Sequence, residues 1–132
     1  MTKKWTKNTT LKYKRKRDIE SLVFAAIDWC KNNLKSSEKL PMIWVDWAVQ
    51  KRCYGEYCFT DNEIIIYPKI HLQVKDIVDT VIHEWVHFLQ GERADDNLQR
   101  YKYYKSKNPS ELEAIKLAKK YTNKCIKEIC TK

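Results

Sequence analysis

Apolar residues recur with a helical period in three stretches of the chain, and each stretch predicts one helix. The first covers about residues 18–35, with Asp18 in the N-cap position. The second covers 76–91 and ends at Gly91, a residue suited to a left-handed C-cap. The third begins near residue 108 and runs to about residue 129. The pattern therefore predicts a first helix followed, after an interruption, by two more.

The interruption has the composition of β-strands. Residues 42–49, 53–59 and 63–67 are rich in β-branched and aromatic side chains, and Pro68 closes the last run. Gly55 allows a bulge or kink in the middle one. We expect a small, mostly antiparallel sheet and hence an α+β fold. An exposed edge strand of that sheet can hold an extended peptide by backbone pairing.

The length and charge of the chain indicate one domain with a basic arm. The 132 residues fit a single domain, here expected over 18–132. The formal net charge is +9, and most of the excess lies in residues 1–17, which contain no acid. We expect these residues to form a flexible arm. The arm lacks an apolar signal core and no long apolar run follows it, which predicts a soluble, cytoplasmic protein without membrane contact.

A basic arm can bind the phosphates of nucleic acids or an acidic partner. Two aromatic residues, Trp5 and Tyr13, are interleaved with the lysines and can stack on bases. The alternative is a solvated extension without a partner. The candidate nucleic-acid-binding residues are Lys12, Lys14, Arg15, Lys16 and Arg17.

The cysteines allow a structural metal site. Four of the five cysteines form two pairs, Cys53 with Cys58 and Cys125 with Cys130, each separated by four residues. Together the pairs could hold a structural zinc ion, although such sites usually have tighter spacing. The simpler interpretation is that these thiols pack as small apolar side chains.

The strongest chemical signal is His83-Glu84-Trp85-Val86-His87, which matches H-E-x-x-H inside the second predicted helix. Histidines four residues apart lie on one helix face, so both rings can bind one metal ion. The glutamate beside the first histidine can then act as general base on a metal-activated water. Two ordinary, hydrogen-bonded histidines on a packed helix are the alternative. The motif favours a catalytic zinc site with Glu84 as the catalytic residue.

A catalytic zinc normally takes three protein ligands, so a third ligand is needed. No histidine follows His87, which leaves an acid or His71. The last helix offers Glu111 and Glu113 on different faces. If Asn108 is the N-cap, Glu111 becomes the capping glutamate and Glu113 is left for the metal. This argument favours Glu113, with Glu111 as the alternative ligand.

These residues carry a resemblance to known metallopeptidases. The H-E-x-x-H motif followed by residues 111–118 resembles the gluzincin arrangement, in particular the E-x-E-A-x-x-x-A helix of ImmA/IrrE-type metallopeptidases and small phage-borne relatives. Residues 52–68 also resemble SprT-like zinc proteases, some of which act on DNA-bound proteins. The chain lacks their third histidine, and Ile115 stands where the ImmA/IrrE pattern has asparagine. The resemblance implies a minimal zincin fold, Glu113 as a ligand, and a virus-encoded protein in the host cytoplasm.

The sequence thus predicts a peptidase that hydrolyses peptides or proteins with one Zn2+ ion. A donor for the tetrahedral oxyanion is also required. The candidates are Tyr101, Tyr103 and Tyr104, which lie between the two predicted zinc-bearing helices and could equally be packing residues. The competing hypotheses are a nucleic-acid- or protein-binding module with a structural zinc and an inactive zincin scaffold.

Overall fold

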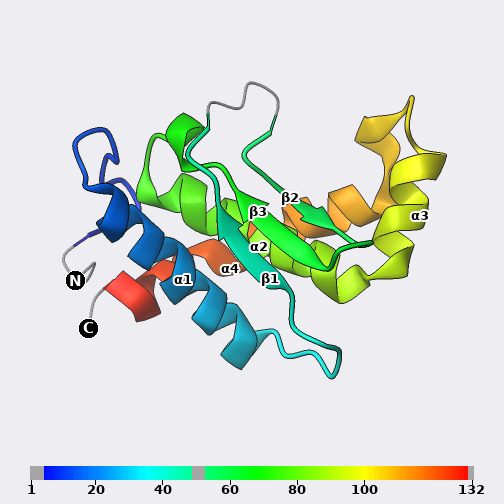
Figure 1. The fold of residues 1–132 in the computed structure, drawn as a ribbon, viewed down its shortest axis with the longest axis horizontal. Coiled ribbons are helices and arrows are strands. Elements are labelled where there is room, and N and C mark those ends of the chain that lie inside the picture. Colours follow the sequence, from blue (N-terminus) through cyan, green and yellow to red (C-terminus); the bar gives the residue numbers. More distant parts are fainter. Residues whose placement is uncertain (1–4, 49–52, 131–132) are drawn as a thin grey trace.

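A computed structural model describes residues 5–48 and 53–130 of the chain. Four α-helices, three strands and two short 3-10 helices follow one another in these residues (Figure 1). In chain order they are α1 (Lys16–Asn33), β1 (Met42–Val45), β2 (Gly55–Cys58), β3 (Glu63–Ile66), η1 (Pro68–Ile70), α2 (Val74–Gln90), α3 (Glu92–Arg100), η2 (Lys105–Lys107) and α4 (Pro109–Cys130). The predicted α+β class is confirmed.

The three strands form one mixed sheet in the order β1-β3-β2. β3 pairs in parallel with β1 and antiparallel with β2, so the sheet is mixed rather than mostly antiparallel. The difference arises because β3 lies between the other two strands and β2 takes the edge. β1 ends at Val45, earlier than predicted, and the last residue of that predicted strand, Val49, lies outside the described residues.

Helices cover one face of this sheet, with α2 at the centre (Figure 1). α2 contacts α1, α4, β2 and β3, which explains why its side chains are buried around most of its circumference. Ile64 and Ile66 of β3 point into the same core and are fully buried. Trp85 lies among them and donates its indole N–H to the carbonyl of Leu34 at 2.8 Å. Burial of this apolar surface fixes α2 against the sheet.

None of the described helices has the length and apolar character needed to cross a membrane.

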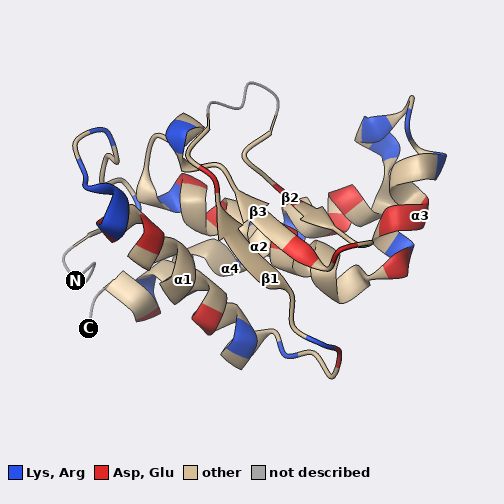
Figure 2. Ribbon diagram, in the orientation of Figure 1, with Lys and Arg blue, Asp and Glu red and all other residues tan. Residues whose placement is uncertain are grey.

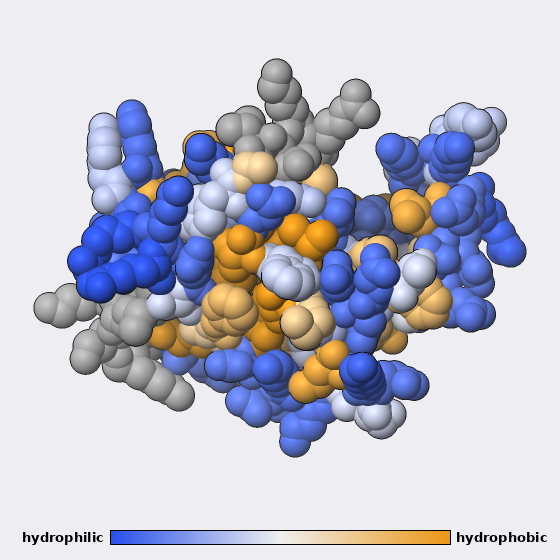
Figure 3. All heavy atoms as spheres, in the orientation of Figure 1, coloured by the Kyte–Doolittle hydropathy of each residue, from blue (hydrophilic) through white to orange (hydrophobic). Residues whose placement is uncertain are grey.

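The opposite face of the sheet carries none of the described helices and exposes apolar side chains. Met42 and Trp44 of β1 are 59% and 49% exposed. The space-filling view shows apolar residues gathered over this part of the molecule (Figure 3). The strands thus have one core face and one open face, as in antiparallel and mixed sheets of α+β folds.

The predicted arm is attached to the domain over the part that the structure describes. Its backbone pairs with the segment before α2, where the N–H of Leu11 donates to Leu72 at 2.9 Å and the N–H of Val74 donates to Thr9 at 3.0 Å. Leu11 is buried in the core. Thr9 to Leu11 therefore lie against the domain, whereas Lys12 to Arg17 are exposed.

Two helix boundaries and one helix differ from the sequence-based expectation. α1 begins at Lys16, with Arg15 rather than Asp18 in the N-cap position. Asp18 lies inside the first turn, where its carboxylate accepts a hydrogen bond from Arg15 at 3.2 Å. α2 begins at Val74, before the predicted start. α3 was not predicted, because it buries none of its residues and so leaves no apolar stripe in the sequence.

Candidate metal centre

His83 and His87 lie on one face of α2, as their spacing predicts. Their ring centroids are 4.9 Å apart, and both side chains are mostly buried. The carboxylate of Glu111 reaches both rings from the first turn of α4. One oxygen lies 2.6 Å from Nε2 of His83, and the other lies 3.1 Å from Nε2 of His87. Side chains 24 or more residues apart in the sequence thus meet at one point.

The N-terminal geometry of α4 explains how Glu111 reaches this point. Asn108 is the N-cap, as predicted, and its side-chain oxygen accepts from the N–H of Ser110 at 2.9 Å. Glu111 precedes the buried residues Ala114 and Ala118 by three and seven positions. This spacing places all three on the helix face that packs on α2. The small alanine side chains let the two helices approach closely, so the carboxylate extends over the rings.

The preference for Glu113 as the third ligand is corrected by this arrangement. One carboxylate oxygen of Glu113 accepts hydrogen bonds from Gln90 at 2.8 Å and from Arg93 at 3.2 Å, away from both rings. The capping argument failed because the Glu111 carboxylate turns toward the histidines and takes no part in the cap. The spacing of Glu111 from Ala114 and Ala118 is the sequence signal that could have identified it.

The three side chains fit a zinc ion. Among the described residues, His83, His87 and Glu111 form a group whose candidate ligand atoms all lie within 4.8 Å of one another. Ligand atoms about 2.0–2.2 Å from a tetrahedral zinc are separated by roughly 3.3 Å, which small side-chain adjustments provide. Two imidazoles and one carboxylate are a ligand set of catalytic zinc sites that leave one position open. The structure therefore contains a possible metal site.

Glu84 lies beside the metal site on the same helix and is only 7% exposed. Burial raises the pKa of its carboxyl to about 7, although the neighbouring histidines oppose this shift. A carboxylate with a pKa near neutrality exchanges protons readily at physiological pH. Glu84 is thus a buried carboxyl group directly beside the candidate ligands.

The ligands themselves are strongly coupled. Hydrogen bonds from His83 and His87 hold the pKa of Glu111 well below its usual range. Burial alone would lower the pKa of His87, but its hydrogen bonds to Glu111 and Gln90 and the charge of Glu84 raise it overall. The rings and the carboxylate thus attract each other in the absence of a cation, which keeps the ligand set assembled.

A cavity of about 320 Å³ opens over the histidine motif and joins it to the sheet edge. Its wall includes Gly55 at the start of β2 and Ile115 of α4, so both elements contribute to it. The residues that line it are Cys53, Tyr54, Gly55, Asp79, Thr80, His83, Glu84, Glu111 and Ile115. Sequence reasoning missed Tyr54 and Asp79, because neither belongs to a recognisable motif.

The predicted oxyanion donors lie elsewhere. Tyr101 ends α3, while Tyr103 and Tyr104 are 84% and 67% exposed, and none of the three lines the cavity. Tyr54 is the tyrosine in the cavity wall. His71, the other histidine considered as a ligand, is buried with its Nε2 2.9 Å from the Thr80 hydroxyl, outside the metal group.

The four-cysteine site is not formed by these residues. Cys53 and Cys58 lie half-buried at the ends of β2, whereas Cys125 and Cys130 are buried on α4. The described residues that could jointly hold a metal include none of them. Burial raises the pKa of the Cys125 thiol to about 12, which disfavours the thiolate that zinc requires. Cys125 is therefore a packing residue.

The predicted nucleic-acid-binding residues cluster at the start of α1, where Figure 2 shows a group of basic residues. Some of their charges already have partners within the chain. Arg15 and Arg17 lie 3.2 and 3.9 Å from the Asp18 carboxylate, and Lys16 lies over the Trp47 ring at 5.3 Å. The cluster is thus partly neutralised before any ligand binds.

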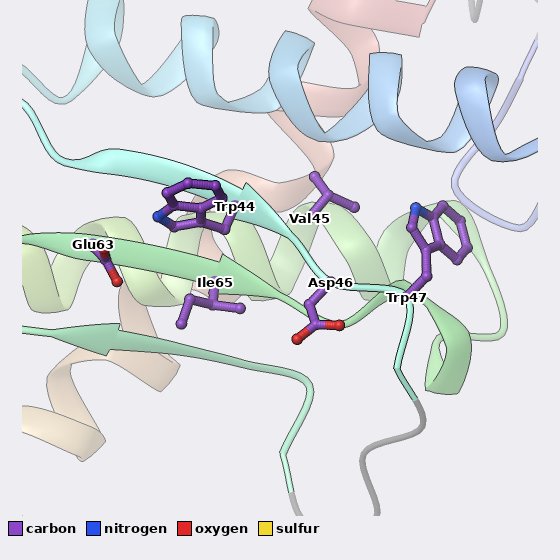
Figure 4. A pocket seen from close by; sticks show the side chains of 6 residues that line it. All are labelled: Trp44, Val45, Asp46, Trp47, Glu63 and Ile65. Carbon is purple, nitrogen blue, oxygen red and sulfur yellow. The ribbon is translucent and has the colours of Figure 1, made fainter.

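A second hollow lies on the open face of the sheet, apart from the metal centre (Figure 4). Trp44 and Ile65 are cross-strand partners in its wall, and Asp46 and Glu63 stand at its margin. It contains no histidine or cysteine. This hollow therefore offers apolar surface and negative charge but no set of metal ligands.

Comparisons with protein-family models, with curated proteins and with solved structures find no match for this chain.

Proposed function

We propose that the chain is a zinc-dependent peptidase. The observation that carries the proposal is the meeting of His83, His87 and Glu111 at one point, with Glu84 buried in the cavity that His83 and Glu111 also line. In this assignment the two histidines and Glu111 bind the ion. When bound, zinc supplies Lewis acidity that lowers the pKa of a water molecule and polarises a substrate carbonyl.

The protein's own catalytic group in this proposal is Glu84. Its carboxylate takes a proton from the attacking water and then delivers that proton to the nitrogen of the leaving amine. Glu84 lines the same cavity as His83 and Glu111, which brings its carboxylate to the water that the ion would bind. Tyr54 in the cavity wall is the candidate donor to the developing oxyanion.

The position of the sheet supports a peptide substrate. β2 is an edge strand, and the residues at its start, Cys53 to Gly55, form part of the cavity wall. A peptide in extended conformation that pairs with such an edge would run past the metal site. This arrangement favours unfolded segments or flexible tails over folded surfaces as substrates.

The decisive experiment combines zinc content with hydrolysis. The chain is purified without added metal, analysed by elemental mass spectrometry, and incubated with a library of unstructured peptides. We expect about one zinc per chain and cleavage that Glu84→Gln reduces by about 100-fold or more while zinc is retained. Glu92→Gln, an exposed acid at the start of α3, is the matched control and should cleave like the wild type. Cleavage that survives Glu84→Gln would refute the mechanism.

The alternative proposal is a nucleic-acid-binding module, supported by the basic cluster at the start of α1 (Figure 2). It predicts binding to DNA or RNA that weakens steeply with salt, because released counterions drive such binding. Replacement of Lys12, Lys14 and Arg17 by glutamine would abolish this binding, whereas Glu84→Gln would leave it intact. Salt-independent or absent binding rejects this alternative.

A further inference from the structure

Gln90, at the end of α2, connects a metal-binding histidine to α4. Its side-chain oxygen lies 2.8 Å from Nδ1 of His87, the ring nitrogen that faces away from Glu111. Its side-chain nitrogen donates to the carbonyl of Ser110 at 2.9 Å and to the carboxylate of Glu113 at 2.8 Å. The residue is buried, so all of its polar atoms are satisfied inside the protein.

These partners allow only one orientation of the Gln90 amide. The Ser110 carbonyl and the Glu113 carboxylate are both acceptors, so the amide NH2 group must face them. A flipped amide would place its oxygen against two other oxygens in a buried site and lose two hydrogen bonds. The amide oxygen is therefore directed at His87.

The orientation of the amide determines which ring nitrogen of His87 carries hydrogen. An amide oxygen only accepts, so Nδ1 of His87 must donate and hence bear a proton. Nε2 of His87 donates to Glu111 in the metal-free arrangement. With Nδ1 held protonated by Gln90, Nε2 is the nitrogen that gives up its proton to bind a metal. The hydrogen bonds that connect Ser110 and Glu113 of α4 to Gln90, and Gln90 to His87, thus select the metal-binding nitrogen.

We propose that Gln90 is a positioning residue that fixes His87 as an Nε2 ligand, and that Glu113 holds Gln90 in the required orientation. Arg93 supports Glu113 in turn, at 3.2 Å. This inference rests on the metal site of the proposed function, and it adds how His87 is held as a ligand through Nε2. It also gives Glu113 a role that differs from direct ligation.

The first test is zinc affinity, measured by competition with a chelator of known affinity. Gln90→Leu removes the acceptor for Nδ1–H, and we expect it to weaken zinc binding by about 10- to 100-fold. Gln99→Leu, on the exposed side of α3, is the matched control and should bind like the wild type. Glu113→Leu should have a smaller effect than Gln90→Leu, and Glu113→Gln, which keeps an acceptor for the Gln90 amide, should recover the wild-type affinity. Unchanged affinity in Gln90→Leu would overturn the proposal.

The second test reads the protonation of the ring, which a merely structural contact would not determine. Nitrogen NMR of the imidazoles in the zinc-loaded chain should show His87 with Nδ1 protonated and Nε2 bound. In metal-free Glu111→Ala, where no carboxylate competes for Nε2, neutral His87 should keep its proton on Nδ1. Adding Gln90→Leu should shift that proton toward Nε2. A His87 ring that binds zinc through Nδ1, or a ring unaffected by Gln90→Leu, would contradict the assignment.

The two tests separate this proposal from the peptidase assignment. A chain that binds zinc in a Gln90-dependent way but cleaves no peptide refutes the peptidase and supports the positioning role. If the wild-type chain cleaves peptides but Gln90→Leu binds zinc with normal affinity, the peptidase assignment is supported and the positioning role is refuted.

Discussion

At the residue scale, the candidate metal centre depends on short polar contacts inside an apolar setting. Each ligand atom has a partner that is itself fixed: Glu111 accepts from both rings, and Gln90 holds the far side of His87. Low local dielectric strengthens these contacts and makes the loss of any one of them costly. Substitutions at neighbouring glutamates should therefore have sharply different effects.

The clearest residue-scale prediction contrasts Glu111 with Glu113. Glu111→Ala removes a ligand, so zinc content should fall from about one ion per chain to well below that. Glu113→Ala should keep most of its zinc as purified, because it affects His87 only through Gln90. Elemental mass spectrometry of the two variants measures the difference. Equal zinc loss in both variants, or zinc loss in Glu113→Ala alone, would instead favour Glu113 as a metal ligand.

His71 gives a prediction on stability and pH. Burial lowers the pKa of His71 below its ordinary value, while the carbonyls of Tyr67 and Pro68 and the charge of Asp76 oppose that shift. The unfolded chain takes up a proton at this residue below about pH 6.5, before the folded chain does. The stability that the neutral His71 side chain contributes is thus complete above about pH 6.5. It is lost as the pH falls toward the lower pKa that His71 has in the folded chain.

The measurement is the free energy of unfolding at neutral and mildly acidic pH. Wild type should lose more stability on acidification than His71→Gln, by up to about 1.4 kcal/mol per pH unit within the window. Glutamine keeps a donor for the Thr80 hydroxyl but does not titrate. Parallel pH profiles of the two proteins would show that His71 does not contribute.

At the element scale, the site depends on how closely three elements approach α2. α4 approaches through Ala114 and Ala118, and α1 packs against both α2 and α4. β2 approaches at Gly55, where an added Cβ would lie 2.8 Å from Cγ2 of Thr80 and 3.0 Å from the carbonyl oxygen of Ile65. The glycine is needed for this contact and not for its backbone angles.

Gly55→Ala should therefore destabilise the fold by about 1–3 kcal/mol through overpacking. Thr80→Ser removes the crowded methyl group but keeps the hydroxyl that bonds Asp76 and His71. The double variant Gly55→Ala/Thr80→Ser should recover part of the loss, with a coupling energy of about 0.5 kcal/mol or more. Denaturant unfolding of the wild type, the two single variants and the double variant gives the double-mutant cycle. Simple additivity would show that β2 and α2 are not in close contact there.

At the scale of the whole molecule, the candidate metal site brings together two helices that are distant in the sequence. His83 and His87 belong to α2 and Glu111 to α4, so a bound ion would add a further link between two helices that already meet through apolar packing and hydrogen bonds. A ligand that binds only the folded chain stabilises it by mass action. Zinc should therefore act on the stability of the entire domain.

We expect zinc at about 100 times its dissociation constant to raise stability by about 2.7 kcal/mol and to raise Tm by several degrees. A chelator should reverse the shift. Glu84→Gln should retain it, and Glu111→Ala should lose it, in differential scanning fluorimetry of matched samples. An identical Tm with and without zinc in the wild type would contradict binding at this site.

The sequence by itself determined the features that depend on local spacing. The helical period set α2, the four-residue interval placed His83 and His87 on one face, and Asn108 marked the start of α4. The β-branched runs located the three described strands, although each strand is shorter than predicted. These features follow from backbone geometry over one or two turns, so neighbouring residues suffice to predict them.

The tertiary structure alone decided which distant groups meet. Glu111 and Glu113 have similar local contexts, and only the packing of α4 on α2 directs the former to the rings and the latter to Gln90. The strand order likewise depends on long-range pairing, which placed β3 in the centre and β2 beside the cavity. Such choices are set by buried apolar contacts between elements, because the free energy of those contacts depends on residues far apart in the chain.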